Sequence, residues 1–220
     1  MSGDEIGTTR HDRGGFTLIE MLVVVAIISI LAGLTLVGVQ AARKYGNEKA
    51  AAIELQMLCA RLQGIGSAFG DFPPTSLADL KIKGNGVNEG NESLFAFLLS
   101  KKHGGPFADD LKEDRWRNFD QDEAKGTDIK TIQSVIDWVR GNNQLLEYVD
   151  FWGSPYIYIH SRDYGKKFKY QGEDGAVFEV EARKSPDTGT YFAPTTFQLW
   201  SLGPDTTNQN GDGDDIVSWK

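Results

Sequence analysis

The sequence contains one long apolar run, from Phe16 to Val39, in which Glu20 is the only ionisable side chain. A helix needs roughly 20 apolar residues, at about 1.5 Å of rise each, to cross the hydrocarbon core of a bilayer. We therefore expect a transmembrane helix over residues 16–40. A carboxylate inside such a span raises the free energy of insertion by about 3 kcal/mol and is tolerated mainly where it has a partner or a function. Glu20 therefore requires an explanation beyond anchoring.

Two ordinary targeting segments compete to explain this run. A secretory signal has an apolar core of about 7–15 residues followed by small residues at a cleavage site, which Val39-Gln40-Ala41 could supply. The run is too long for such a core, and Glu20 lies inside it. A plain signal anchor explains the length but leaves both the Gly15-Phe16 junction and Glu20 unexplained.

A short polar leader precedes the sequence Gly15-Phe16-Thr17-Leu18-Ile19-Glu20. This arrangement resembles the prepilin class of the type IV filament superfamily. The resemblance implies that a prepilin peptidase removes the leader, residues 1–15, by cleaving after Gly15 and then methylates the new amino group of Phe16. It also implies that Glu20 pairs with the Phe16 amine of a neighbouring subunit during filament assembly. Such pairing would remove the penalty of a lone charge in lipid and fix the register of the helices.

Composition limits the remaining possibilities. The 220 residues leave enough chain after the leader and span for one soluble domain with its own core, which we place at residues 41–220. The net charge of −8 argues against nucleic-acid binding. Cys59 is the only cysteine, so no internal disulfide can form. In the family that the leader resembles, pilins of the twitching type often carry a C-terminal disulfide loop, whereas the major pseudopilins of type II secretion bind calcium instead. The single cysteine favours the second group.

The pattern after the span predicts an α+β, pilin-like fold. Apolar residues recur at steps of three and four up to Phe69, so the membrane-spanning helix continues to about that position before Gly70-Asp71-Phe72-Pro73-Pro74 ends it. Strands are expected at residues 156–160, 167–170, 176–182 and 196–202, and short helices at residues 92–100 and 127–141. We expect the lower half of the long helix to pack on a small antiparallel sheet. The compact family pattern lacks residues 83–148, which we interpret as a helical insertion.

Four carboxylates lie close together near the C-terminus, at Asp205, Asp212, Asp214 and Asp215. Carboxylates at this density repel one another unless they are protonated or bridged by a cation, and calcium prefers such oxygen ligands. An EF-hand is excluded because Asp215 occupies the position of its turn glycine and the chain ends before the bidentate glutamate. An acidic solvated tail is the competing interpretation.

Two further segments carry the resemblance to pseudopilins. Residues 150–156, Asp-Phe-Trp-Gly-Ser-Pro-Tyr, are similar to the segment that opens the pseudopilin sheet, and residues 202–219 are similar to the pseudopilin ending. This second similarity implies that Asp205, Asp214 and Asp215 are Ca²⁺ ligands and that backbone carbonyls such as that of Leu202 complete the shell. It leaves Asp212 either a ligand or merely solvated.

The sequence does not indicate an enzyme. The three histidines have no metal-ligand spacing, Cys59 lies close to an apolar helix stripe, and no phosphate-loop or nucleophile-elbow pattern occurs. The resemblance implies instead a structural subunit of a type II secretion pseudopilus. Its implied partners are further copies of the chain, the prepilin peptidase, an inner-membrane platform protein, an assembly ATPase and minor pseudopilins. It would be a single-pass inner-membrane protein with a periplasmic C-terminal domain. A pilus pilin, a minor pseudopilin and a membrane-tethered binding module are the alternatives.

Overall fold

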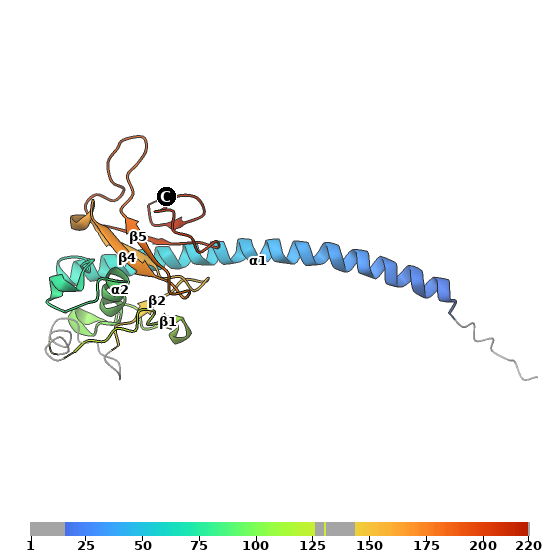
Figure 1. The fold of residues 1–220 in the computed structure, drawn as a ribbon, viewed down its shortest axis with the longest axis horizontal. Helices are drawn as coiled ribbons and strands as arrows, with labels where there is room; N and C mark the ends of the chain where they lie inside the picture. Colours follow the sequence, from blue (N-terminus) through green and yellow to red (C-terminus); the bar gives the residue numbers. More distant parts are fainter. Residues whose placement is uncertain (1–15, 126–129, 131–143, 220) are drawn as a thin grey trace, which may run out of the picture. The chain divides into compact units, whose positions relative to one another are not determined.

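The computed structural model describes residues 16–125, 130 and 144–219 (Figure 1). The chain divides into two compact units, Met1–Lys44 and Tyr45–Lys220, which we call the N-terminal and C-terminal units and describe separately. Helix α1 (Leu18–Phe69) contributes residues to both units. The fold is α+β, as the sequence predicts, and is consistent with a pilin-like fold.

In the N-terminal unit, α1 begins two residues after Phe16. Its large apolar side chains are exposed along the described part of the helix, from Leu18 to Leu31. Within the residues that the structure describes, no helix combines the length and the hydropathy that a membrane span requires.

In the C-terminal unit, the last part of α1 packs on the sheet through the apolar stripe that the sequence predicts. Leu55, Leu58, Leu62 and Ile65 are all buried and share one core with side chains from the strands. The helix ends at Phe69, as expected, and Gly70 follows with a positive φ of 82°. A left-handed residue just past the last turn is a common helix stop, and glycine adopts this conformation without strain.

The central sheet is antiparallel and has three strands in the order β3 (Ile157–His160), β6 (Phe197–Ser201) and β7 (Ile216–Val217). Side chains of β3 alternate between two cores because successive residues point to opposite faces of a sheet. Tyr158 joins the core against α1, whereas Ile157 and Ile159 join a second core around Trp200. Both faces are therefore covered, which explains why every residue of β3 and β6 is buried.

The described part of the C-terminal unit also contains two smaller two-stranded sheets. The hairpin of β4 (Lys167–Gln171) and β5 (Val177–Glu181) closes the second core, and β1 (Trp116–Arg117) pairs with β2 (Glu147–Tyr148). The four strands predicted from the sequence are confirmed as β3, β4, β5 and β6. Strands β1, β2 and β7 were not predicted, because two residues are too few to show an alternating pattern.

The segment interpreted as an insertion contains the second α-helix, α2 (Glu89–Leu99), close to the helix predicted at residues 92–100. Leu94, Phe95 and Leu98 of α2 belong to the same core as α1 and the central sheet. Among its described residues, the C-terminal unit also has short 3₁₀ helices at Leu77–Leu80, Lys102–Gly104, Glu113–Arg115 and Ser161–Asp163. The helix predicted at residues 127–141 lies almost entirely outside the described residues.

Asn91 of α2 is buried and bonds to the backbone of two other segments. Its amide nitrogen donates to the carbonyl oxygens of Tyr148, at 2.9 Å, and of Tyr156, at 2.7 Å, and its amide oxygen accepts from the Tyr148 nitrogen at 2.8 Å. Buried polar groups are normally satisfied in this way. Asn91 thereby fixes α2 against β2 and the start of β3.

Candidate functional site

The N-terminal motif places Glu20 at the first turn of α1. Its Oε2 accepts hydrogen bonds from the backbone nitrogen and the hydroxyl of Thr17, both at 2.8 Å. The Thr17 hydroxyl accepts in turn from the Glu20 nitrogen at 3.3 Å. This reciprocal pattern is a capping box, which satisfies backbone donors that a helix start leaves free. Sequence reasoning missed this role, although Thr-x-x-Glu before an apolar run is its usual signature.

The residues predicted to be processed lie immediately before this cap. Phe16 is 77% exposed, and Gly15 lies outside the described residues. Glu20 is also exposed within a single chain. The predictions of cleavage after Gly15, methylation of Phe16 and assembly through Glu20 stay predictions.

At the C-terminus, the two ends of the acidic loop meet. Asp214 Oδ2 accepts from the backbone nitrogen of Asp205 at 3.3 Å. Gly203 has a positive φ of 69°, and a Cβ at this position would collide with the carbonyl oxygen of Asp214. Only glycine permits this approach without strain. The structure therefore brings Asp205 and Asp214, two of the predicted calcium ligands, to the neck of one loop.

The carboxylates of Asp205 and Asp215 are each turned toward donors within the loop. Asp205 accepts from Thr207 N at 2.7 Å and from Gln209 Nε2 at 3.2 Å. Asp215 Oδ2 accepts from Gly211 N at 2.7 Å, while its buried Oδ1 has no hydrogen-bond partner among the described residues. Burial, with a smaller contribution from the neighbouring carboxylates, raises the pKa of Asp215 to about 6. An unpartnered buried oxygen of this kind fits a cation ligand.

Asp212 is oriented differently from the other predicted ligands. Its Oδ2 lies 2.8 Å from Nη2 of Arg183 in an exposed ion pair. Leu202, whose carbonyl was predicted to bind calcium, has its side chain buried in the second core. Within the described chain, the acidic groups whose ligand atoms all lie within 4.8 Å of one another are at a different place, Glu92, Asp120 and Asp122. The calcium site at residues 202–219 thus stays a prediction. Asp205, Asp214 and Asp215 suit a cation site, whereas Asp212 is paired with Arg183.

The two C-terminal segments singled out in the sequence are adjacent in space. Asp150 Oδ1 accepts from the backbone nitrogens of Trp152 and Ser154, both at 2.9 Å, and its Oδ2 accepts from the Ser201 hydroxyl at 2.5 Å. Because Ser201 ends β6, these bonds join the Trp-Gly-Ser-Pro turn to the start of the acidic loop.

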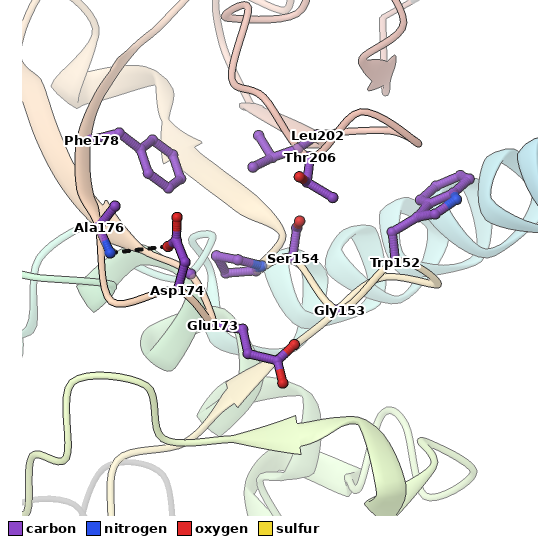
Figure 2. A pocket seen from close by; sticks show the side chains of 11 residues that line it. Trp152, Gly153, Ser154, Glu173, Asp174, Ala176, Phe178, Leu202 and Thr206 are labelled. Atoms are coloured by element: carbon purple, nitrogen blue, oxygen red, sulfur yellow. Dashed lines mark hydrogen bonds between the residues drawn. The ribbon is translucent and has the colours of Figure 1, made fainter.

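An open pocket of about 400 Å³ lies where this turn, the β4–β5 hairpin and the loop meet (Figure 2). Trp152 and Thr206 line it from the turn and the loop, and Glu173 and Asp174 line it from the hairpin. Asp174 Oδ1 accepts from the nitrogen of Ala176 at 3.0 Å, which holds this carboxylate in the hairpin turn.

Comparison with known proteins identifies the N-terminal motif. A family model described as the prokaryotic N-terminal methylation motif matches residues 10–36. The chain carries this motif. The match includes Gly15, Phe16 and Glu20 and supports a type IV pilin-like family with a prepilin-type hydrophobic N-terminal anchor. No curated protein and no solved structure matches the chain.

Proteins with this motif are structural pilin subunits. The expectation that the chain is not an enzyme is therefore confirmed by the motif.

Proposed function

We propose that this chain is the structural subunit of a type II secretion pseudopilus. In this proposal the prepilin peptidase cleaves after Gly15 and methylates the amine of Phe16, and the mature subunits polymerise into a filament that drives protein export across the outer membrane. The observation that carries the proposal is the methylation motif at residues 10–36, which includes the capped start of the apolar helix α1.

The geometry around Glu20 supports a role in assembly. Both hydrogen bonds from Thr17 reach Oε2, so within the described part of the chain Oε1 is open to a further donor. Cleavage would create a positively charged amine on Phe16, one residue before Thr17. A neighbouring subunit's Phe16 amine could then bind Oε1 while the cap stays intact. Pairing of opposite charges in an apolar environment offsets the cost of burying either charge alone.

The exposed apolar side chains of residues 16–33 support a membrane location before assembly. Lipid would cover them in the inner membrane, and neighbouring helices would cover them in the filament. The C-terminal unit would lie in the periplasm. Lifting the subunit out of the membrane would require the assembly ATPase and the platform protein, with minor pseudopilins as further partners.

The acidic loop and the single cysteine favour secretion over a pilus. In this proposal Asp205, Asp214 and Asp215 hold a structural Ca²⁺ with backbone carbonyls such as that of Leu202, and the ion fastens the loop that a disulfide would otherwise close. Asp212 contributes less to this site, because it is paired with Arg183.

Gene deletion in the host organism tests this function. If the chain is a pseudopilin, the deleted strain loses protein export and keeps its surface pili. Loss of pili with export intact would instead identify a pilus pilin, and loss of neither would identify a membrane-tethered binding module. Either of these outcomes would overturn the proposal.

Complementation then tests the residues. Wild-type chain should restore export and yield filaments whose subunits begin with N-methylated phenylalanine at position 16, as read by mass spectrometry. The Glu20→Ala variant should be cleaved but should not assemble. Asp187→Ala, which removes an equal charge from an exposed loop, is the matched control and should assemble normally.

A further inference from the structure

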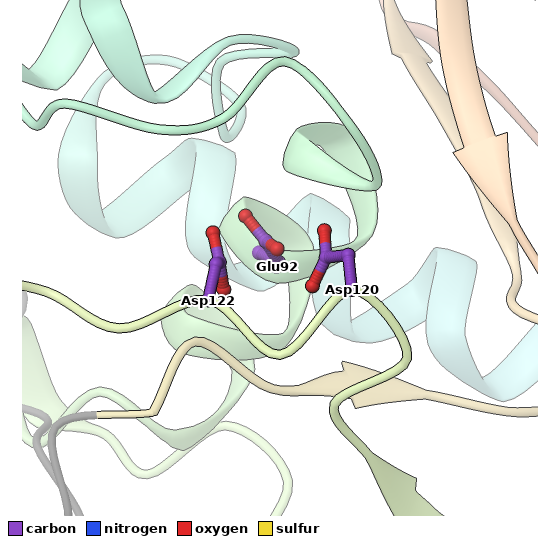
Figure 3. A group of neighbouring side chains, drawn as sticks. All are labelled: Glu92, Asp120 and Asp122. Atoms are coloured by element: carbon purple, nitrogen blue, oxygen red, sulfur yellow. The ribbon is translucent and has the colours of Figure 1, made fainter. Parts of the chain in front are cut away.

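A second group of carboxylates lies in the segment between α1 and the central sheet. Glu92 is on α2, and Asp120 and Asp122 are on the loop that follows β1. One oxygen from each residue lies within 4.8 Å of the others. Figure 3 shows the Glu92 carboxylate between the two aspartates, which approach it from the same loop.

The Glu92 carboxylate is buried and has no hydrogen-bond partner within the part of the chain that the structure describes. The residue is 2% exposed, and neither Oε1 nor Oε2 has a partner among the described residues. One oxygen each of Asp120 and Asp122 is likewise buried and unpartnered. Native proteins rarely bury a carboxylate in this way, because an ionised group without partners loses its hydration and gains nothing in return.

The electrostatic surroundings of Glu92 make an ionised state still less favourable. Burial raises its pKa well above the usual value, and the neighbours that add most to this effect are Asp122, Glu147, Asp120 and Glu89, all of them carboxylates. Burial and the same kind of neighbours raise the pKa of Asp122 to about 7. A bound divalent cation would reverse these effects, since it replaces repulsion by attraction at every oxygen that faces it.

The surrounding backbone and amide groups orient the aspartates. Asp120 Oδ2 accepts from Asn85 Nδ2 at 2.9 Å, which leaves Oδ1 as its open atom. Asn118 bonds to the backbone nitrogen and carbonyl oxygen of Asp122, at 3.1 and 2.9 Å, and so closes the turn between the two aspartates. Partners that hold a ligand in place are typical of metal sites.

We propose that Glu92, Asp120 and Asp122 bind one calcium ion, which fastens the loop after β1 to α2. Three carboxylates form a hard, all-oxygen donor set, to which calcium binds at about 2.3–2.6 Å, so two of its ligand oxygens can lie no more than roughly 5 Å apart. The observed spacing satisfies this limit. Magnesium is disfavoured because it usually keeps several waters and takes only one or two carboxylates.

This site is independent of the predicted calcium loop at residues 202–219 and of the proposed role in secretion. It would fasten a loop to the main core of the C-terminal unit in a chain whose one cysteine cannot form an internal disulfide.

Calcium binding to the full chain in detergent micelles tests the proposal. Equilibrium dialysis against radioactive calcium measures the number of ions bound per chain. The double variant Asp205→Asn, Asp214→Asn removes the C-terminal loop site, and we expect it to retain one bound calcium. Adding Glu92→Gln should abolish that remaining ion. Adding Glu123→Gln instead should leave the remaining ion bound. Glu123 is exposed, and its replacement removes an equal charge next to Asp122.

Each other outcome overturns the assignment. The proposal fails if the loop double variant binds no calcium, if Glu92→Gln leaves binding unchanged, or if magnesium competes with calcium at equal concentration. Asp122→Asn is a second variant in case the first disturbs the fold, and near-ultraviolet circular dichroism verifies folding of both. The C-terminal calcium site is tested separately by the same experiment. If the double variant Asp205→Asn, Asp214→Asn binds as many ions as the wild type, that site does not bind calcium.

Discussion

Replacing Arg115 by methionine should strongly destabilise the C-terminal unit. The Arg115 guanidinium lies 2.8 Å from Glu54 Oε2 and donates to the carbonyl oxygen of Val149 from Nε, at 2.8 Å, and from Nη2, at 2.6 Å. It also lies over the rings of Tyr148, at 4.5 Å from the centroid, and Phe151, at 4.7 Å. The Arg115 and Glu54 side chains are only 13% and 12% exposed. Arg115, which lies just before β1, therefore connects Glu54 of α1 to Val149, just after β2, in a largely buried environment.

The expected cost follows from the charge that methionine leaves behind. Without Arg115, Glu54 stays largely buried with two tyrosine hydroxyls as donors, those of Tyr148 and Tyr156. Removing one partner of a buried ion pair typically lowers the free energy of unfolding by about 3–5 kcal/mol. For a domain of this size, 1 kcal/mol corresponds to a change of about 2–4 °C in melting temperature, so 3 kcal/mol lowers it by about 6–12 °C.

Tryptophan fluorescence during thermal unfolding measures this effect. All five tryptophans follow residue 45 in the sequence, so the signal in detergent-solubilised chain reports on the C-terminal unit alone. Arg162→Met is the matched control, because its ion pair with Asp71 joins side chains that are 45% and 54% exposed. Exposed pairs contribute about 0–1 kcal/mol, so this variant should melt within about 4 °C of the wild type.

A double variant separates the charge effect from lost packing. Replacing Glu54 by glutamine together with Arg115→Met removes both charges, and we expect it to be more stable than Arg115→Met alone. Equal melting temperatures for Arg115→Met and Arg162→Met would refute the reasoning. So would a double variant in which the two single effects simply add.

Three further predictions concern α2 and its neighbours, all measured by the same melting assay. Gly90→Ala should destabilise the C-terminal unit by about 1–3 kcal/mol, because a Cβ there would lie 2.5 Å from the carbonyl oxygen of Tyr158. Alanine is the better helix former by about 1 kcal/mol, so a stabilised variant would show that propensity outweighs the clash. Asn91→Ala should lower the free energy of unfolding by about 3 kcal/mol, since three buried backbone groups each lose a hydrogen bond, although the Tyr148 carbonyl keeps a further one from the Tyr156 nitrogen at 3.3 Å. A loss below about 1 kcal/mol would show that other groups replace the lost bonds. In the presence of chelator, unfolding should become easier between about pH 5 and pH 8. Burial raises the folded-state pKa of Glu147 from 4.5 to about 8, so its contribution is present below the unfolded pKa and is lost as the pH rises through the folded one. Glu147→Gln, which imitates the protonated acid, should flatten this slope, and an unchanged slope would exclude Glu147 as its source.

The architecture was largely predictable because strong local patterns produce it. The apolar stripe through Leu55 and Ile65 has the helical period, and the strands that became β3 and β6 are rich in aromatic and β-branched residues. The long helix, its end at Phe69 and four strands followed from these patterns. The capping box of Thr17 and Glu20 also has a local signature. It was missed because Glu20, a charge within an apolar run, was interpreted only as an assembly residue.

The candidate metal sites depend on contacts that the sequence does not show. Asp212 has the same residue type and nearly the same position as Asp214, yet it pairs with Arg183, a residue 29 positions away. Glu92 and Asp122 are 30 positions apart along the chain, and only the fold brings their carboxylates together. Closely spaced acidic residues in the sequence therefore predicted the candidate site at residues 202–219, but they did not indicate the one formed by Glu92, Asp120 and Asp122.

The first half of α2 shows that residues 83–148 form part of the packed core of the C-terminal unit. Gly90, Asn91 and Glu92 are consecutive, polar or small, and would be expected on a solvated surface, yet all three are buried. Gly90 allows the backbone of β3 to approach, Asn91 bonds to the backbone of β2 and of Tyr156, and Glu92 faces two aspartates of the loop after β1. Because the second half of the same helix fills the core against α1, deleting the segment would expose that core rather than trim a surface loop. A function assigned to this segment must therefore be compatible with a structural role in every subunit.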